Sequence, residues 1–172
     1  MAILEIKTYP DPILREHARP IEYISEEIKR LSADMIETMR FAKGAGLAAN
    51  QVGIPIRLIV LELKGKKGDK PMAIINPEIV LAESEEIAEE GCLSVPGFYE
   101  FIKRAKKVYV KGIDIEGKFF ETECEGYLAR AFQHEIDHLN GKLFIDYLSP
   151  VKRNIFKKKY LNPNYARVSL KK

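Results

Sequence analysis

Residues 126–141 decide the fold and read Gly-Tyr-Leu-Ala-Arg-Ala-Phe-Gln-His-Glu-Ile-Asp-His-Leu-Asn-Gly. The apolar side chains of Leu128, Phe132, Ile136 and Leu139 recur at helical spacing, which predicts an amphipathic helix over 126–139. Asn140-Gly141 supplies the residues that commonly end a helix. An apolar stripe of this kind has to be buried, so we expect the rest of the chain to pack around this helix.

The same helix carries two histidines four residues apart, His134 and His138. At about 3.6 residues per turn, side chains with this spacing project from one face and can bind the same metal ion. Glu135 lies beside them, where its carboxylate can act on a bound water without being a ligand. HExxH is short enough to arise by chance, and the alternative is an exposed helix face with an incidental charged pair.

A catalytic metal site of this kind needs a third protein ligand. The sequence has no histidine after His138, and Phe144 stands where HExxHxxGxxH proteases place their third histidine. The two cysteines are therefore the candidates. Cys92 precedes Pro96-Gly97, for which we predict a turn, whereas Cys124 is flanked by carboxylates that would raise the pKa of its thiol. Cys92 is favoured as the ligand, and its alternative fate is that of a buried free thiol.

The remainder of the chain predicts a second helix and a β-rich middle. Ser25 can cap a helix that ends before Gly44, because apolar residues recur between them at helical spacing. We expect a helical turn at 13–17, a glycine-rich loop at 44–51, strands at 57–63, 72–75, 79–82, 107–113 and 118–122, and a tight turn at 65–69. This order predicts an α+β fold, with small mixed or antiparallel sheets around the helix that carries HExxH.

The length of 172 residues and the hydrophobic content of 46% fit one compact domain spanning residues 1–172. The chain has no apolar stretch of membrane-spanning length, and its first residues lack the features of a secretory or transit segment. We therefore expect a cytoplasmic protein with no membrane partner. We also expect a monomer. In that reducing compartment the two cysteines should be thiols or metal ligands, because structural disulfides are rare there.

The charge of the chain is unevenly distributed. Eight of the 28 Lys and Arg residues lie in 151–172, which has no Asp or Glu, so the first 150 residues carry the other 20 together with all 25 acidic residues. This pattern predicts a basic tail from about residue 151, with a helix that begins near Val151 and ends before Asn162-Pro163. A basic surface of this size suits a polyanion such as the ribosome surface, without sequence-specific recognition of nucleic acid.

Three segments together resemble the signature motifs of peptide deformylases: 44–51 (GAGLAANQ), 90–94 (EGCLS) and 133–138 (QHEIDH). They occur in the order found in that family, and the likeness extends to residues 9–14 and 146–150. The resemblance implies that Cys92, His134 and His138 hold one divalent metal ion. That ion would be ferrous iron in the cell, and zinc, nickel or cobalt could use the same ligands. The ligand types alone do not choose between iron and zinc.

The resemblance also implies the reaction, which is hydrolysis of the N-terminal formyl group of formyl-methionyl nascent polypeptides with release of formate. Glu135 would be the general acid and base for a metal-bound water. The side-chain amide of Gln51 and the backbone N–H of Leu93 would stabilise the negative oxygen that forms during attack.

The substrate pocket is implied partly by helix geometry. Tyr127 and Ala131 precede His134 by seven and three residues, so all three lie on one face of the helix beside the metal. The resemblance adds backbone from Ala45, Gly46, Glu90 and Gly91 alongside the bound peptide. The chain departs from the usual residues of the family at Ala45, Tyr127 and Arg130.

Two other functions fit parts of the sequence. A zinc endopeptidase would also use HExxH, and it differs in the third ligand and the pocket. A structural metal module that binds RNA through the basic tail would need a fourth protein ligand. None is evident in the sequence unless Cys124 supplies it.

Overall fold

The computed structural model describes residues 1–63, 70–162 and 164, and it contains both helices predicted most strongly by the sequence. The elements along the chain are η1 (Pro12–Arg15), α1 (Glu26–Phe41), β1 (Gly46–Ala48), η2 (Ala49–Val52), β2 (Leu58–Leu61), β3 (Met72–Glu83), β4 (Glu86–Cys92), β5 (Val95–Arg104), β6 (Lys107–Asp114), β7 (Phe119–Glu125), α2 (Gly126–Leu139), η3 (Phe144–Tyr147) and α3 (Pro150–Tyr160).

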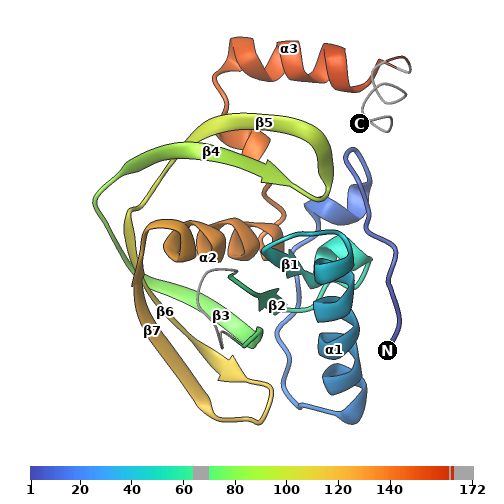
Figure 1. Cartoon of the computed structure of the whole chain (residues 1–172), viewed down its shortest axis with the longest axis vertical. Coiled ribbons are helices and arrows are strands. Elements are labelled where there is room, and N and C mark those ends of the chain that lie inside the picture. The colour runs from blue at the N-terminus through green and yellow to red at the C-terminus, as the bar shows by residue number, and fades with distance from the viewer. Residues whose placement is uncertain (64–69, 163, 165–172) are drawn as a thin grey trace.

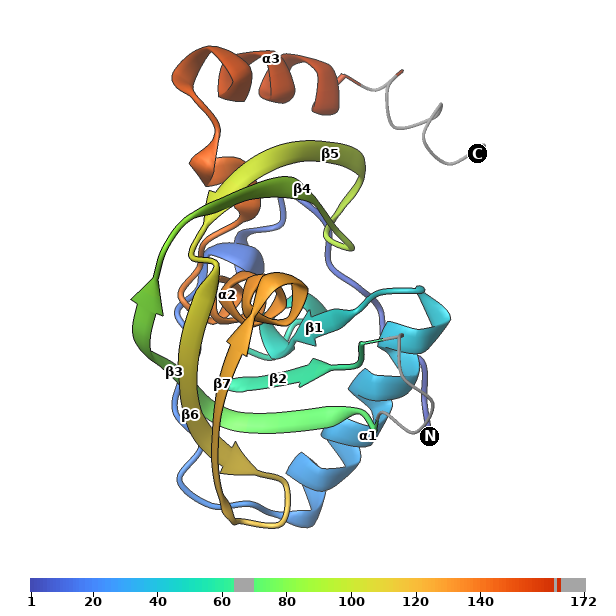
Figure 2. The same ribbon diagram turned by 60° about the vertical axis from the view of Figure 1, so that its left-hand side comes forward.

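Helix α2 lies between two antiparallel sheets (Figures 1 and 2). On one side is a five-stranded sheet with the order β1-β2-β3-β6-β7, and on the other is the β4–β5 hairpin. This arrangement confirms the predicted α+β fold around the helix that carries HExxH. Within the described ranges, no helix has both the length and the apolar character needed to cross a membrane.

Local sequence signals explain the ends of the two long helices. The Ser25 hydroxyl accepts a hydrogen bond from the backbone N–H of Ile28, which caps α1 as predicted. Helix α2 spans the predicted residues, and Gly141 follows it with a φ of 72°, a conformation that a glycine adopts at little cost. Helix α3 begins at Pro150, within one residue of the predicted start.

The strand predictions need two corrections in the large sheet. The separate strands expected at 72–75 and 79–82 belong to one strand, β3, which pairs with β6 along most of its length. The register shifts between Ile75 and Glu78, where Asn76 has a φ of 50° and Pro77 has no N–H to donate, so the irregularity is a bulge and not a break. In addition, the predicted loop at 44–51 contains strand β1. The turn predicted at 65–69 lies outside the described residues.

The β4–β5 hairpin was not predicted as a pair of strands, and the turn placed at Pro96-Gly97 was wrong. The turn is formed by Leu93 and Ser94, between the paired residues Cys92 and Val95. Pro96 and Gly97 lie inside β5 instead. A proline is tolerated there because each strand of a two-stranded sheet has an edge with no partner.

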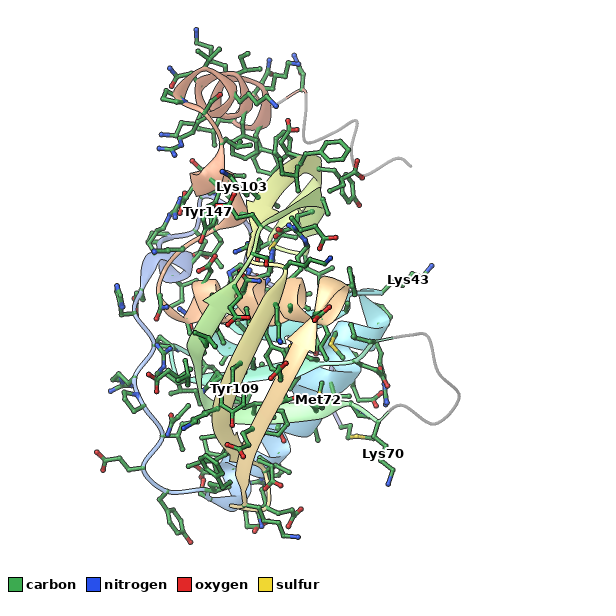
Figure 3. All side chains as sticks on the ribbon, turned by 90° about the vertical axis from the view of Figure 1, so that its left-hand side faces the viewer. Lys43, Lys70, Met72, Lys103, Tyr109 and Tyr147 are labelled. Carbon is green, nitrogen blue, oxygen red and sulfur yellow. The ribbon has the colours of Figure 1, made fainter. Side chains whose placement is uncertain are left out.

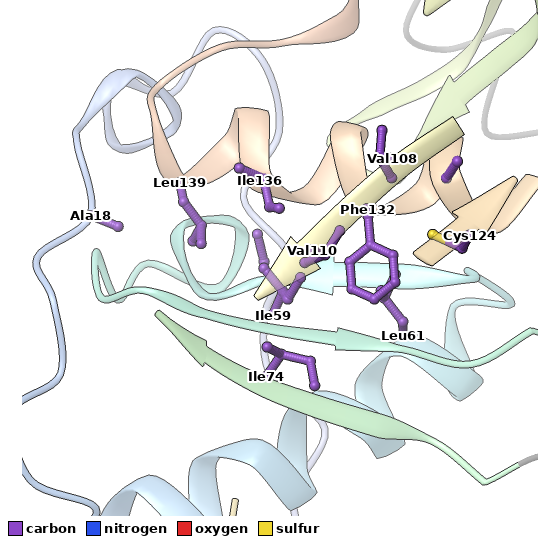
Figure 4. Packing of buried hydrophobic residues seen from close by; sticks show 12 residues of the cluster. Ala18, Ile59, Leu61, Ile74, Val108, Val110, Cys124, Phe132, Ile136 and Leu139 are labelled. Carbon is purple, nitrogen blue, oxygen red and sulfur yellow. The ribbon is translucent and has the colours of Figure 1, made fainter. Parts of the chain in front are cut away.

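Alternate residues of β2 face opposite sides of the large sheet, and each side is covered by a helix. Ile59 and Leu61 pack with Phe132 of α2, as Figure 4 shows, whereas Leu58 and Val60 pack with α1. A third buried cluster joins the β4–β5 hairpin to η3 and α3. These layers bury α2 on both sides and bring the hairpin close to its histidines.

Candidate metal centre and active site

Side chains of Cys92, His134 and His138 converge at one point in the structure. The Cys92 Sγ and the His134 Nε2 each lie 3.3 Å from the His138 Nε2, and the possible ligand atoms all lie within 4.8 Å of one another. Both histidines come from α2, and Cys92 comes from the end of β4. Within residues 1–63, 70–162 and 164, no other group of three or more His, Cys, Asp or Glu side chains is arranged to hold a metal ion.

The chemistry of these three side chains fits a divalent transition metal. A thiolate sulfur and two imidazole nitrogens suit Fe²⁺, Zn²⁺, Co²⁺ and Ni²⁺, and poorly suit Mg²⁺ or Ca²⁺. Three protein ligands are the number found in catalytic sites, which keep a further position for water or substrate. The hairpin turn at Leu93 and Ser94 holds Cys92 against the helix, although Cys92 lies more than 40 positions before either histidine in the sequence.

Cys124 does not belong to this cluster. Its side chain packs in the core formed between α2 and the large sheet (Figure 4). Burial raises the pKa of the Cys124 thiol to about 11. The sequence predicted a raised pKa but attributed it to the flanking carboxylates, whereas Glu123 and Glu125 are exposed on the opposite face of β7.

Glu135 is buried beside the cluster. Its Oε2 atom has no hydrogen-bond partner among the described residues, and burial raises the pKa of Glu135 to about 7. The carboxylate fits against Gly46, where a Cβ atom would lie only 2.5 Å from Oε1. Glycine at position 46 thus leaves the space that the Glu135 carboxylate occupies. A carboxyl group with a pKa near neutrality can both accept and release a proton.

The Gln51 side chain is fixed at both ends. Its Oε1 accepts a hydrogen bond of 2.9 Å from the backbone N–H of Ala48, and its Nε2 donates one of 3.0 Å to the Ser94 hydroxyl. The same Nε2 lies 3.6 Å from the Cys92 sulfur. The amide therefore presents its N–H groups to the hairpin turn that includes Leu93.

A cavity of about 390 Å³ opens beside the cluster, between α2, β1 and the β4–β5 hairpin. Every site residue predicted from the sequence lines it except His138, which is almost fully buried. Figure 3 shows Lys43, one of the lining residues, extending into solvent from the end of α1. The predicted lining residues are Ala45, Gly46, Gln51, Glu90, Gly91, Cys92, Leu93, Tyr127, Ala131, His134 and Glu135, and those that were not predicted are Lys43, Gly44, Glu89, Pro96, Gly97, Tyr99 and Arg130.

The Glu90 side chain lies in a buried ionic network behind the cluster. Its carboxylate accepts hydrogen bonds of 2.7 and 2.9 Å from Arg104, one of 2.6 Å from Arg130 and one of 2.8 Å from the His134 Nδ1. Burial alone would raise the pKa of Glu90, but the hydrogen bonds from His134 and Arg104 outweigh it and lower the pKa to about 2. The sequence had placed only the backbone of Glu90 in the site.

The network extends to Asp137, near the C-terminal end of α2. Arg104 also donates to Asp137 at 2.7 Å, and the Tyr147 hydroxyl, beside the hairpin in Figure 3, donates to the same Asp137 oxygen at 2.7 Å. The roles of Arg104 and Asp137 could not be predicted, because they depend on pairing between segments that are far apart in the sequence. The one local signal is the charge of Arg104 at a position that β5 buries.

Comparison with known proteins identifies the family. Residues 3–154 match the sequence model of the family described as polypeptide deformylase. The chain is 50% identical over 159 residues to a peptide deformylase of Alkalilimnicola ehrlichii, covering 92% of this chain and 89% of that protein. It is 52% identical over 161 residues to one of Thermodesulfovibrio yellowstonii, covering 93% and 98%.

Solved structures agree with the sequences. A peptide deformylase from Legionella pneumophila superposes with a TM-score of 0.90 at 47% identity, over 99% of both chains. The peptide deformylase from Ehrlichia chaffeensis in complex with actinonin gives a TM-score of 0.86 at 40% identity, over 92% of this chain and 98% of that one. The chain therefore belongs to the polypeptide deformylase family, whose members are metal-dependent hydrolases that remove the formyl group from nascent polypeptides.

Proposed function

We propose that Cys92, His134 and His138 hold one divalent metal ion, which is ferrous iron in the cell and which zinc, nickel or cobalt can replace. The convergence of their Sγ and Nε2 atoms beside a cavity that Cys92 and His134 line, next to the buried Glu135, carries this proposal. Once bound, the ion supplies Lewis-acid activation of a water molecule and of the formyl oxygen.

Glu135 moves the protons of the reaction. Its unpartnered Oε2 is available to accept a proton from the attacking water, and the same carboxyl group then delivers it to the departing amine. The Gln51 Nε2 and the backbone N–H of Leu93 stabilise the negative charge that develops on the formyl oxygen. The hydrogen bond from Ala48 to Gln51 holds the amide in place beforehand, so little reorganisation accompanies the reaction.

The substrate is the formyl-methionyl end of a nascent polypeptide. Its methionine side chain enters the cavity against Tyr127 and Ala131. Strand β1 lies at an edge of the large sheet and β4 has a free edge in its hairpin, so an extended peptide can pair with the backbone on either side. Ala45, Gly46, Glu90 and Gly91 supply this backbone. We also infer that actinonin binds in the same cavity.

The basic helix α3 delivers a cytoplasmic, monomeric enzyme to the ribosome. Phe156 is buried against the hairpin and anchors the helix, while Lys157, Lys158 and Lys159 are exposed. Two other cations of the helix are already engaged: Lys152 pairs with Glu100 at 3.4 Å, and Arg153 donates to the Asp146 carbonyl at 2.5 Å. The three consecutive lysines thus supply most of the attraction.

Substrate choice tests the proposed activity. The protein loaded anaerobically with Fe²⁺ should release formate from a formyl-Met tripeptide, and it should leave both the acetyl-Met tripeptide and the internal peptide bonds intact. The acetyl group adds one methyl at the reacting carbon and serves as the matched control. Cleavage of internal bonds without release of formate would instead indicate an endopeptidase and contradict the proposal.

A further inference from the structure

We propose that the Glu90 carboxylate is a positioning residue, which fixes the proton of His134 on Nδ1 and thereby directs the lone pair of Nε2 toward the metal. This inference rests on the proposed metal site. It assigns to the Glu90 side chain a role separate from that of its backbone, which lines the cavity. The Glu90 side chain touches neither the substrate nor the metal in this scheme and acts only through His134.

The first support is the geometry of the His134 ring. Its Nδ1 lies 2.8 Å from the Glu90 Oε1, and its Nε2 points to the cluster, 3.3 Å from the His138 Nε2. A carboxylate can only accept a hydrogen bond, so Nδ1 must carry a proton, and Nε2 is then the nitrogen that the neutral imidazole offers to a metal. A metal-binding histidine typically needs this arrangement, and a carboxylate partner also makes the ligand nitrogen more basic.

The second support is that Glu90 itself is held in one position. Both of its oxygens accept hydrogen bonds from Arg104, and Arg130 donates to Oε2, while all three side chains are at most 6% exposed. The two guanidinium groups therefore hold the carboxylate at the position from which it contacts His134. Rigid outer partners are what hold the ligands of a metal site in a productive geometry.

A purely structural ion pair is the competing explanation, since buried salt bridges occur without any role at a metal site. The Arg104–Asp137 pair in the same network offers the comparison. Asp137 accepts a hydrogen bond of 2.7 Å from Arg104 but no described hydrogen bond joins it to His134. Removing the charge of Asp137 therefore weakens the network but leaves Glu90 as the hydrogen-bond partner of His134.

Metal affinity of Glu90→Gln and Asp137→Asn tests the proposal. The probe is Zn²⁺ alone, measured by competition with a chromophoric chelator, with far-UV circular dichroism of each metal-free protein as the check on folding. We expect Glu90→Gln to bind Zn²⁺ about 10- to 100-fold more weakly than the wild type. Asp137→Asn should stay within about 3-fold of it, because the Glu90–His134 hydrogen bond remains.

Nitrogen NMR of the imidazoles in the Zn²⁺-loaded wild type provides a second test that needs no variant. It should show the proton of His134 on Nδ1 and the metal on Nε2. Metal on Nδ1, an unchanged affinity in Glu90→Gln, or equal losses in the two variants would each overturn the role of Glu90. A wild type that binds no Zn²⁺ would instead contradict the metal site itself.

Discussion

At the scale of single residues, Gly46 illustrates how tightly the site is built. A Cβ atom at this position would lie 2.5 Å from the Glu135 Oε1 and 2.8 Å from the Leu61 side chain. Gly46→Ala should therefore displace the Glu135 carboxylate and lower kcat about 10-fold or more, since small misplacements of catalytic groups are costly. Metal content should be unchanged because position 46 touches no ligand. Full activity in this variant would contradict the prediction and would show that the Glu135 carboxylate tolerates a Cβ atom at position 46.

The two cysteines should differ sharply in reactivity and in their effect on the metal. Cys124 is buried and its pKa is raised to about 11, so at pH 8 only about one molecule in a thousand carries the thiolate. Iodoacetamide added to the metal-free protein at pH 8 should modify Cys92 first, as peptide mass spectrometry can show.

The serine variants complete this prediction. Cys92→Ser should lose or strongly weaken metal binding, whereas Cys124→Ser should keep both the metal and the activity. Equal loss of metal from both variants would contradict the ligand assignment.

At the scale of secondary structure, the helices were predictable and the hairpin was not. Helix α2 follows from a periodic apolar stripe and a glycine stop, which are local signals. The inward-facing positions of the β4–β5 hairpin include Glu90 and Arg104, so the alternation of apolar and polar residues that normally marks a strand is absent. These charges are buried only because they pair with one another and with α2, and a single segment of sequence does not contain that information.

The end of α2 provides a stability test at the same scale. Gly141 has a φ of 72°, and a Cβ atom there would collide with the backbone carbonyl of Arg15. Gly126 begins the helix with a φ of 65°, but it has no atom within 4 Å of the corresponding position. Gly126→Ala should cost about 1 kcal/mol of unfolding free energy, from backbone strain alone.

Gly141→Ala should cost more than this control, on the order of 2–3 kcal/mol, because the collision with backbone adds to the strain. Urea denaturation followed by circular dichroism measures both values. Similar losses of unfolding free energy in the two variants would contradict this prediction and would show that the backbone at Arg15 moves to make room.

At the scale of the whole molecule, the positive charge gathered on α3 predicts a role for this helix that is separate from catalysis. Reversal of Lys157, Lys158 and Lys159 to Glu should weaken co-sedimentation with ribosomes, most at low salt, because fewer phosphate contacts remain. Hydrolysis of a formyl-Met tripeptide should be unchanged, since these lysines do not line the cavity. The matched control reverses three exposed cations elsewhere, Arg30, Lys106 and Lys118. Ribosome binding that is unchanged, or that falls equally in the control, would contradict the delivery role.

Some parts of the site could be predicted from the sequence, whereas others depend on the whole fold. The types and spacing of His134 and His138 pointed to a metal. The local sequence favoured Cys92 over Cys124 as the third ligand, and the resemblance to deformylases implied the same residue. The convergence of the three depends on the hairpin, which carries Cys92 onto α2. The ionic network around Glu90 was not predicted, because it joins two strands and a helix through pairings that form only when the sheets enclose α2.

The most direct test of the proposed mechanism compares formate release by the wild type and by Glu135→Gln, both loaded anaerobically with Fe²⁺. We expect one equivalent of metal in each protein, because Glu135 is not a ligand. Turnover of a formyl-Met tripeptide should fall on the order of 10²-fold or more in the variant, because the amide cannot accept the proton. Turnover near that of the wild type, with metal bound, would contradict the assignment of Glu135 and with it the proposed mechanism.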